Sequence, residues 1–321
     1  MSAELTPWIV FLVAVAALLV IDLGVLGRRG DVMSTRKALL WSAVWIGLGL
    51  SFSLAVWGWR GAEAAQEYLA GYLIEESLSI DNLFVFLLVF GSLGIALRYQ
   101  RKVLFWGILG AIVMRGAFIF AGVAVLERFS WVMYLFGALL VVTAIRLLRS
   151  RGVQVDPQRN PMVRVARRLF PLAPEYEGNA FTVRRAGRRM LTPLAIALVA
   201  VESADVVFAV DSVPAVLAVS DDVFVVFTSN VAAILGLRSL YFALAGSLQR
   251  FEYLSWGLAA VLGFVGVKML LAEFVHIPIY LSLTVIVIAV GGSILASLWL
   301  TRGRDKPALP GDGSPERAEE A

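Results

Sequence analysis

The feature that most constrains this chain is a series of apolar segments, each about as long as a membrane core is thick. A helix needs about 20 apolar residues to cross that core. The chain has 321 residues, is 60% hydrophobic and only 16% charged, whereas about 25% charge is usual in soluble domains. We therefore predict an all-α polytopic membrane protein with about nine transmembrane helices. The expected spans are 7–26, 38–58, 66–96, 103–126, 129–149, 191–218, 222–247, 253–272 and 278–300.

The basic residues predict how these spans are oriented. With nine spans, 23 of the 28 Lys and Arg residues fall on one side of the membrane and two, Arg60 and Arg128, on the other. Cytoplasmic loops carry the excess of positive charge, so we expect the N-terminus outside and the C-terminus in the cytoplasm. The same rule explains the basic connection 150–190, in which we see no folded platform with interleaved aromatic residues of the kind that nucleic-acid binding would require. We expect no nucleic-acid partner.

Two of the expected spans carry acids where water is scarce. "YLIEESLSIDNLFVF" contains Glu75, Glu76 and Asp81, and "LVAVESADVVFAVDSVPAVLAV" contains Glu202, Asp205 and Asp211. Ionisable residues inside a membrane are rare and usually functional. These acids are therefore the first candidates for a functional site.

The acid-bearing segments align with each other and predict an internal repeat. With Asp81-Asn82 placed on Asp211-Ser212, Glu75 falls opposite Asp205, and Arg115 of the next span corresponds to Arg238. Three spans per unit is an odd number, so the second unit must enter the membrane from the opposite side. Inverted repeats of this kind build many transporters, with the site at the midplane between discontinuous helices.

The repeat organises the expected domains. Residues 1–300 form one transmembrane transporter domain, made of repeat 66–149, the cytoplasmic basic loop 150–190 and repeat 191–272. Residues 301–321 are rich in Pro, Gly and charge, so we expect a disordered cytoplasmic tail.

The third and sixth spans are expected to be broken beside their acids. Side chains six residues apart on a straight helix lie about 120° off a common face. Pro214 removes a backbone donor, and the Ser, Asp and Asn side chains of "SIDN" and "AVDS" compete with the helix for backbone hydrogen bonds. A break in each span would turn its two acids towards one site.

Counting charges favours a cation site over simple ion pairing. More than three residues from the end of a span there are seven acids, whereas only Arg115, Arg238 and Lys268 provide positive charge there. If all ionise, four negative charges stay unpaired, at a cost of roughly 2.5–3.5 kcal/mol each. Either some acids keep their protons or a cation is bound. The seventh acid, Asp22, lies near the end of its span, where Arg28 and Arg29 offer local partners.

The expected ligands are carboxylate, amide and hydroxyl oxygens, which suit Mg²⁺, Mn²⁺ or Ca²⁺. The chain has no cysteine and only one histidine, His276, in an outer connection, so a zinc or copper site is disfavoured. We predict no permanently bound cofactor. The predicted metal ligands are Glu75, Asp81, Asn82, Glu202, Asp205, Asp211 and Ser212, with Arg115 and Arg238 compensating charge and Asp22, Glu76 and Lys268 as accessory residues.

Several of these segments resemble the TerC/Alx family of integral membrane proteins, named for tellurium resistance. The likeness covers almost the whole chain and is most specific in "SLSIDNLFVF" and in "FAVDSVPA…TSN…ILGLRSLYF". One departure is the first cytoplasmic loop, "RRGDVMSTRKA", which lacks the histidine and glutamate that the family often has there.

The resemblance implies a nine-span transporter of a bacterial cytoplasmic membrane that exports Mn²⁺. Divalent-cation transport follows from the residues as well, but manganese and the outward direction come from the family alone. Protons are the expected counter-ion, since an acid-rich site binds metal only when it is deprotonated. The oligomeric state stays open.

The sequence also allows comparison with two other classes of function. One is a membrane scaffold that senses or delivers metal in tellurite or alkaline stress without bulk transport. The other is an intramembrane enzyme, which the sequence disfavours because no Gly-x-Gly-Asp motif is present and the single histidine is outside the spans. A tellurite pump is also disfavoured, because an acid-lined site repels an oxyanion.

Overall fold

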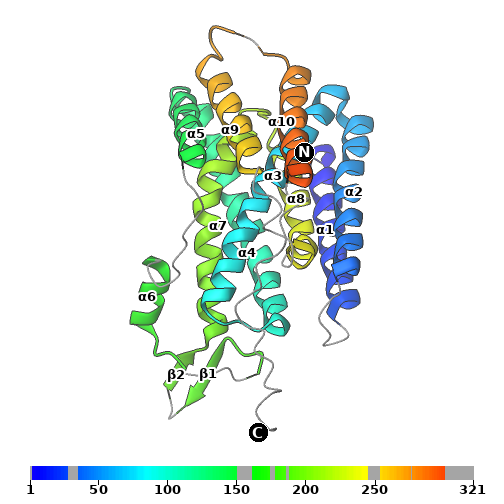
Figure 1. The fold of residues 1–321 in the computed structure, drawn as a ribbon. Coiled ribbons are helices and arrows are strands. Elements are labelled where there is room, and N and C mark those ends of the chain that lie inside the picture. Colours follow the sequence, from blue (N-terminus) through cyan, green and yellow to red (C-terminus); the bar gives the residue numbers. More distant parts are fainter. Residues whose placement is uncertain are drawn as a thin grey trace.

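The protein is a bundle of long helices with a short helix and a two-stranded sheet at one end (Figure 1). A computed structural model describes residues 2–27, 35–149, 161–173, 178–185, 188–244, 254–275 and 277–300. The helices are α1 (Ser2–Gly27), α2 (Thr35–Arg60), α3 (Ala62–Ser92), α4 (Leu97–Arg128), α5 (Val132–Arg149), α6 (Pro161–Leu169), α7 (Pro193–Leu217), α8 (Val223–Leu244), α9 (Leu254–Leu270) and α10 (Ile279–Leu300), and the strands are β1 (Thr182–Arg185) and β2 (Arg188–Leu191).

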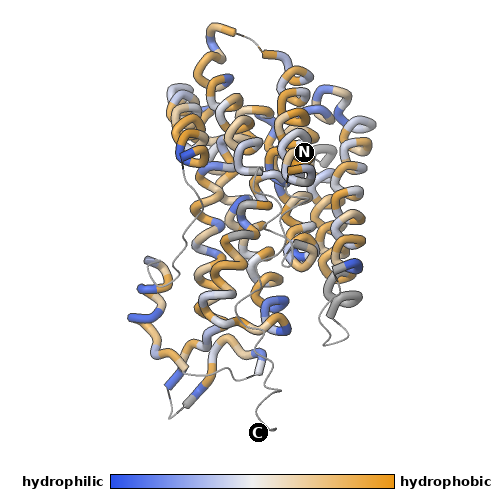
Figure 2. The backbone as a smooth tube through the Cα atoms, in the orientation of Figure 1, coloured by the Kyte–Doolittle hydropathy of each residue, from blue (hydrophilic) through white to orange (hydrophobic). Residues whose placement is uncertain are grey.

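Each of the nine predicted spans overlaps one long helix. Within the described part of the chain, six helices are long and apolar enough to cross a membrane: α2, α4, α5, α7, α8 and α10. The apolar helical stretches in α1 and α9 are shorter, and α3 is long but contains five acids. Figure 2 shows the long helices as mainly hydrophobic, with hydrophilic residues at the helix ends, on α6 and on the hairpin.

The two ends of the bundle differ in charge. At the end that carries α6 and the hairpin, Lys102 donates to the carbonyl of Asn179 and lies 4.5 Å from the ring centroid of Phe181. We call this the basic end. At the opposite end, Arg60 pairs with Asp222, and Ser220 Oγ donates to Glu67 Oε2 at 2.5 Å.

Local sequence explains where several helices begin. Gly61 has a φ of +93°, which only glycine adopts without strain, and it turns the chain from α2 into α3. Asp222 caps α8, because its Oδ1 accepts from the backbone N–H of Phe224 at 2.8 Å. Pro193 opens α7, where a missing backbone donor has no cost.

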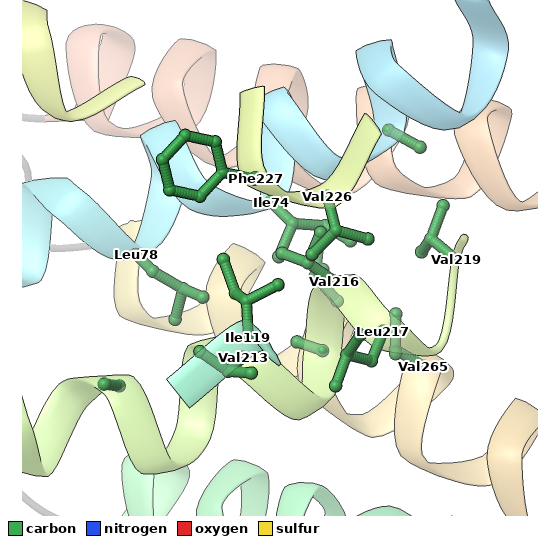
Figure 3. Packing of buried hydrophobic residues seen from close by; sticks show 14 of the residues in the cluster. Ile74, Leu78, Ile119, Val213, Val216, Leu217, Val219, Val226, Phe227 and Val265 are labelled. Carbon is green, nitrogen blue, oxygen red and sulfur yellow. The ribbon is translucent and has the colours of Figure 1, made fainter. Parts of the chain in front are cut away.

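Four helices form the centre of the bundle. α3 and α4 each pack against both α7 and α8, α2 covers α3 and α8, and α5 packs along α9. The largest cluster of buried apolar side chains draws on these helices (Figure 3). The acid-bearing α3 and α7 therefore lie in the interior of the bundle.

The predicted breaks in the third and sixth spans are absent. α3 is continuous past Glu75 and Asp81, and α7 is continuous past Asp211 with Pro214 inside it. An unwound turn between apolar helices would leave several backbone groups without partners, whereas Pro214 removes a single donor. The continuous helix is the less costly arrangement.

The basic connection 150–190 is also more ordered than expected. It contains α6 and an antiparallel hairpin in which Arg184 stands opposite Arg189. Backbone bonds tie this segment to the start of α7: Ala173 N–H donates to Leu191 O at 2.8 Å, and Thr192 N–H donates to Phe181 O at 3.0 Å. The predicted tail 301–321 lies outside the described residues.

Two glycines let α5 and α9 approach closely. A Cβ at Gly137 would lie 2.9 Å from the carbonyl oxygen of Gly266, and a Cβ at Gly266 would lie 2.8 Å from that of Gly137. Small residues permit such backbone contact between membrane helices. The α5–α9 pair therefore depends on both glycines.

We predict that Gly137→Ala destabilises the protein by about 1–3 kcal/mol, because the added methyl group forces two backbones apart. The measurement is thermal unfolding in detergent. Gly47→Ala on α2 is the matched control, since a Cβ there meets nothing within 4 Å. Equal melting temperatures for the two variants would contradict the prediction.

Candidate functional site

The largest fully buried side chain in the described structure is that of Arg115 of α4, which is charged. Its guanidinium forms an ion pair with Glu75 of α3 and a second with Asp205 of α7, where Nη2 donates to Oδ1 at 3.3 Å. Glu75 is completely buried and Asp205 nearly so. Three helices are therefore joined by one arginine and two carboxylates.

Two neutral oxygens complete the surroundings of the guanidinium. Arg115 Nη1 donates to Ser212 Oγ of α7 and to Asn230 Oδ1 of α8, both at 3.1 Å. Asn230 is held in place by its own amide, which donates to the Val226 carbonyl one turn earlier at 3.2 Å. We call Arg115, Glu75, Asp205, Ser212 and Asn230 the Arg115 centre.

This centre contains more acceptor capacity than the arginine uses. Glu75 Oε2 and Asp205 Oδ2 are buried and have no hydrogen-bond partner among the described residues. Buried polar atoms are normally satisfied, and a carboxylate oxygen in an apolar interior needs a proton or a cation. Each open oxygen can therefore take a proton or contact a cation.

More polar groups continue from the Arg115 centre towards the basic end. Glu202 lies one turn before Asp205 on α7, and its carboxylate stands where a Cβ of Gly110 would be. Asn82 lies seven residues after Glu75 on the same face of α3, about 10 Å along the axis, and neither its amide oxygen nor its amide nitrogen has a partner among the described residues. Arg238, also buried, lies two turns from Asn230 in the same direction.

Towards the opposite end the centre is covered by apolar side chains. Ile119 follows Arg115 by one turn, and Val213 and Val216 follow Ser212 on α7. Val226 and Phe227 precede Asn230 on α8. All five are buried and pack together (Figure 3). We call these five residues the apolar seal.

Asp211 does not join the Arg115 centre. Its Oδ1 accepts from Thr143 Oγ1 of α5 at 3.0 Å, and Arg146 acts on it electrostatically. Because α7 is continuous, Asp205 and Asp211 point about 120° apart. The expected break would have brought them together, and its absence explains why Asp211 faces α5.

The accessory residues lie elsewhere. Glu76 is one residue after Glu75 on α3 and hydrogen-bonds with Tyr72, whose ring stacks on Tyr68. Lys268 of α9 is half-buried and interacts electrostatically with Glu67 and Asp221, so it belongs to the opposite end of the bundle.

Five residues singled out in the sequence have no described side chain. Asp81 lies on α3 and Asp22 on α1, but their side chains are outside the described part of the structure. Arg28 and Arg29, the partners suggested for Asp22, and His276 fall outside the described residues altogether. Among described residues, no group of three or more His, Cys, Asp or Glu side chains is arranged to hold a metal.

Asn230 and Thr143 are the polar partners that sequence reasoning missed. Each is a single neutral side chain in an apolar helix, so it changes neither the charge count nor the hydropathy of its span. The only available signal was the polar run "TSN" at residues 228–230.

Comparison with known proteins places this arrangement in a family. Residues 60–305 match the family described as "Integral membrane protein TerC family". The chain is 48% identical over 295 residues to "Uncharacterized membrane protein STKORF319" of Myxococcus xanthus, covering 92% of each chain. It is 42% identical over 308 residues to "Putative membrane-bound redox modulator Alx" of Salmonella typhi, covering 93% of this chain and 96% of the relative.

No solved structure matches the chain. The family match extends from the end of α2 to beyond α10 and so includes every residue of the Arg115 centre. Together with the near full-length relatives, it confirms the resemblance seen in the acid-bearing segments. The chain belongs to the TerC family of integral membrane proteins.

Proposed function

We propose that this protein transports divalent cations across the membrane, with Mn²⁺ export as its physiological activity. The observation that carries the proposal is the surroundings of Arg115. One cationic group lies among two carboxylates, a hydroxyl and an amide oxygen. Oxygen ligands of this kind suit Mn²⁺, Mg²⁺ and Ca²⁺.

Arg115 then acts as a tethered cation that occupies the site when no metal is bound. Its positive charge stabilises Glu75 and Asp205 in the empty state. An incoming divalent ion replaces part of that charge, and the open oxygens of both carboxylates give it ligands. The same arginine helps the metal ion to leave, because its guanidinium can pair again with the two carboxylates that the metal ion gives up.

The direction of entry follows from the polar residues around the centre. Glu202 and Asn82 extend from the centre towards the basic end, whereas the apolar seal covers the other side. With the basic end in the cytoplasm, metal reaches the centre from inside the cell. Export then requires the apolar seal to part.

We further propose that nine helices span the membrane as two inverted three-helix repeats, α3–α5 and α7–α9. In such a pair of repeats α3 corresponds to α7, α4 to α8 and α5 to α9. The α3–α8 contact then corresponds to the α4–α7 contact, and both contacts are present. The α3–α7, α4–α8 and α5–α9 contacts each map onto themselves, and all three are also present. This pattern supports a two-fold relation between the repeats.

A non-transporting metal scaffold is the alternative, and flux distinguishes the two because a scaffold binds metal without moving it. The name of the Salmonella relative suggests a redox role for that protein. The 321 residues of this chain contain no cysteine, so a redox effect here would act through a transported ion rather than through its own thiols.

The proposed topology predicts opposite labelling of two introduced cysteines. In intact cells, an impermeant maleimide should label Asp221→Cys at once and Thr182→Cys only after permeabilisation. Both positions are exposed, and the chain has no cysteine of its own. Labelling of both residues from the same face would rule out the nine-span arrangement.

Neutralising the central acids should abolish transport. We expect Glu75→Gln and Asp205→Asn each to lower Mn²⁺ flux into proteoliposomes to background, while Glu127→Gln, an exposed acid at the end of α4, leaves it unchanged. In the unaltered protein, the KM for Mn²⁺ should rise as pH falls on the metal-loading side, since protons and metal compete for the carboxylates. Flux that persists in both central variants would refute this assignment.

Removing the tethered cation should tighten metal binding and slow release. For Arg115→Gln we expect the Kd for Mn²⁺ at alkaline pH to fall by about tenfold, equivalent to about 1.4 kcal/mol, and turnover to fall as well. Calorimetry on the protein in detergent measures the first quantity and vesicle flux the second. A folded variant with unchanged or weaker binding would show that Arg115 is only a structural partner of the acids.

A further inference from the structure

The short helix α6 divides its nine residues among three faces. Val163 is fully buried, within the same cluster as Leu194 and Ala197 of α7, and Ala166 packs against that cluster. This face fixes α6 beside the first turns of α7 at the basic end of the bundle (Figure 1).

A second face of α6 exposes apolar side chains. Val165 is 53% exposed and Leu169 is 69% exposed. They are four residues apart, so they lie on one side of the helix, one turn from each other. Phe170, just after the helix, is exposed as well.

The third face of α6 is basic. Arg164, Arg167 and Arg168 are all exposed, and their spacing of three and four residues places them together on the helix surface. None of the ion pairs found among the described residues involves them. The positive-inside rule explains why this connection is basic, but it requires no arrangement of the charges on one face.

The hairpin adds further positive charge next to α6. Arg184 and Arg189 are exposed and stand directly opposite each other on β1 and β2. Like charges placed opposite each other destabilise a strand pair, so a nearby anion would relieve this repulsion.

We infer that α6 is an interfacial helix, with Val165, Leu169 and Phe170 inserted at the headgroup boundary and its arginines bound to anionic lipid headgroups. An amphipathic helix of this composition lies in the plane of a membrane surface, and its binding depends on buried apolar area and on attraction to anionic lipid. The first turns of α7, against which α6 packs, belong to a candidate membrane-spanning helix. The bilayer surface is therefore the partner within reach of both exposed faces.

The test places a nitroxide label on each face of α6 in the full-length protein. Leu169→Cys reports on the apolar face, and Arg164→Cys is the matched control on the basic face of the same helix. Each labelled protein is reconstituted in vesicles of phosphatidylcholine alone or mixed with phosphatidylglycerol. Collisions with oxygen, which partitions into lipid, are compared with collisions with a water-soluble nickel chelate.

We expect oxygen to dominate at residue 169 and the chelate at residue 164, with the oxygen preference at 169 higher in the vesicles that contain phosphatidylglycerol. Adding Arg164→Gln, Arg167→Gln and Arg168→Gln to the Leu169→Cys protein should reduce the effect of phosphatidylglycerol by roughly a factor of two or more. Chelate-dominated collisions at both residues would overturn the inference. So would equal results in the two lipids, or spin–spin broadening at 169 that reveals a second copy of the chain as the partner.

Discussion

A buried arginine that shares two carboxylates across three helices is the interaction on which the structure depends. Each of these charges would be very costly alone in an apolar interior, and the pairing of Arg115 with Glu75 and Asp205 offsets part of that cost. The pairing also fixes the order of packing, since α3, α4 and α7 must converge at one level for the ions to meet. Ser212 and Asn230 add neutral oxygens without adding charge. The proposed cation site and the structural core are thus the same set of residues.

The sequence predicted the long helices well because a membrane span is recognised by length and hydropathy alone. It also identified the acids of the centre and Arg115, since charges in an apolar segment are conspicuous. The direction in which each acid points was harder to predict. Asp211 was expected at the centre, but its position depended on a helix break, and the backbone hydrogen bonds of a continuous α7 proved the stronger constraint. Asn230 was missed because a single neutral amide changes neither the charge count of its span nor its hydropathy appreciably.

The connection between α5 and α7 was also only partly predicted. Its many arginines predicted on which side of the membrane the connection lies. The same charge count did not reveal that three of these arginines form one face of a short helix. α6 is too short to be identified from periodicity with confidence in a basic segment, and β1 and β2 have only four residues each. Their order comes from contacts with the start of α7, which follows β2 directly, and with the start of α4, which is distant in sequence. Charge determines the side of the membrane on which such a segment lies, whereas tertiary contacts determine its shape.

The apolar seal also has an electrical consequence. On the proposed route through the bundle, the layer formed by Ile119, Val213, Val216, Val226 and Phe227 is apolar, so we expect most of the membrane voltage to fall across it. Moving one elementary charge through that voltage involves about 2.3 kcal/mol per 100 mV. Mn²⁺ carries two charges, so the proposed export against an inside-negative potential would be opposed by twice that amount. If two protons return for each metal ion, no net charge crosses the layer, and the cell's voltage no longer opposes export.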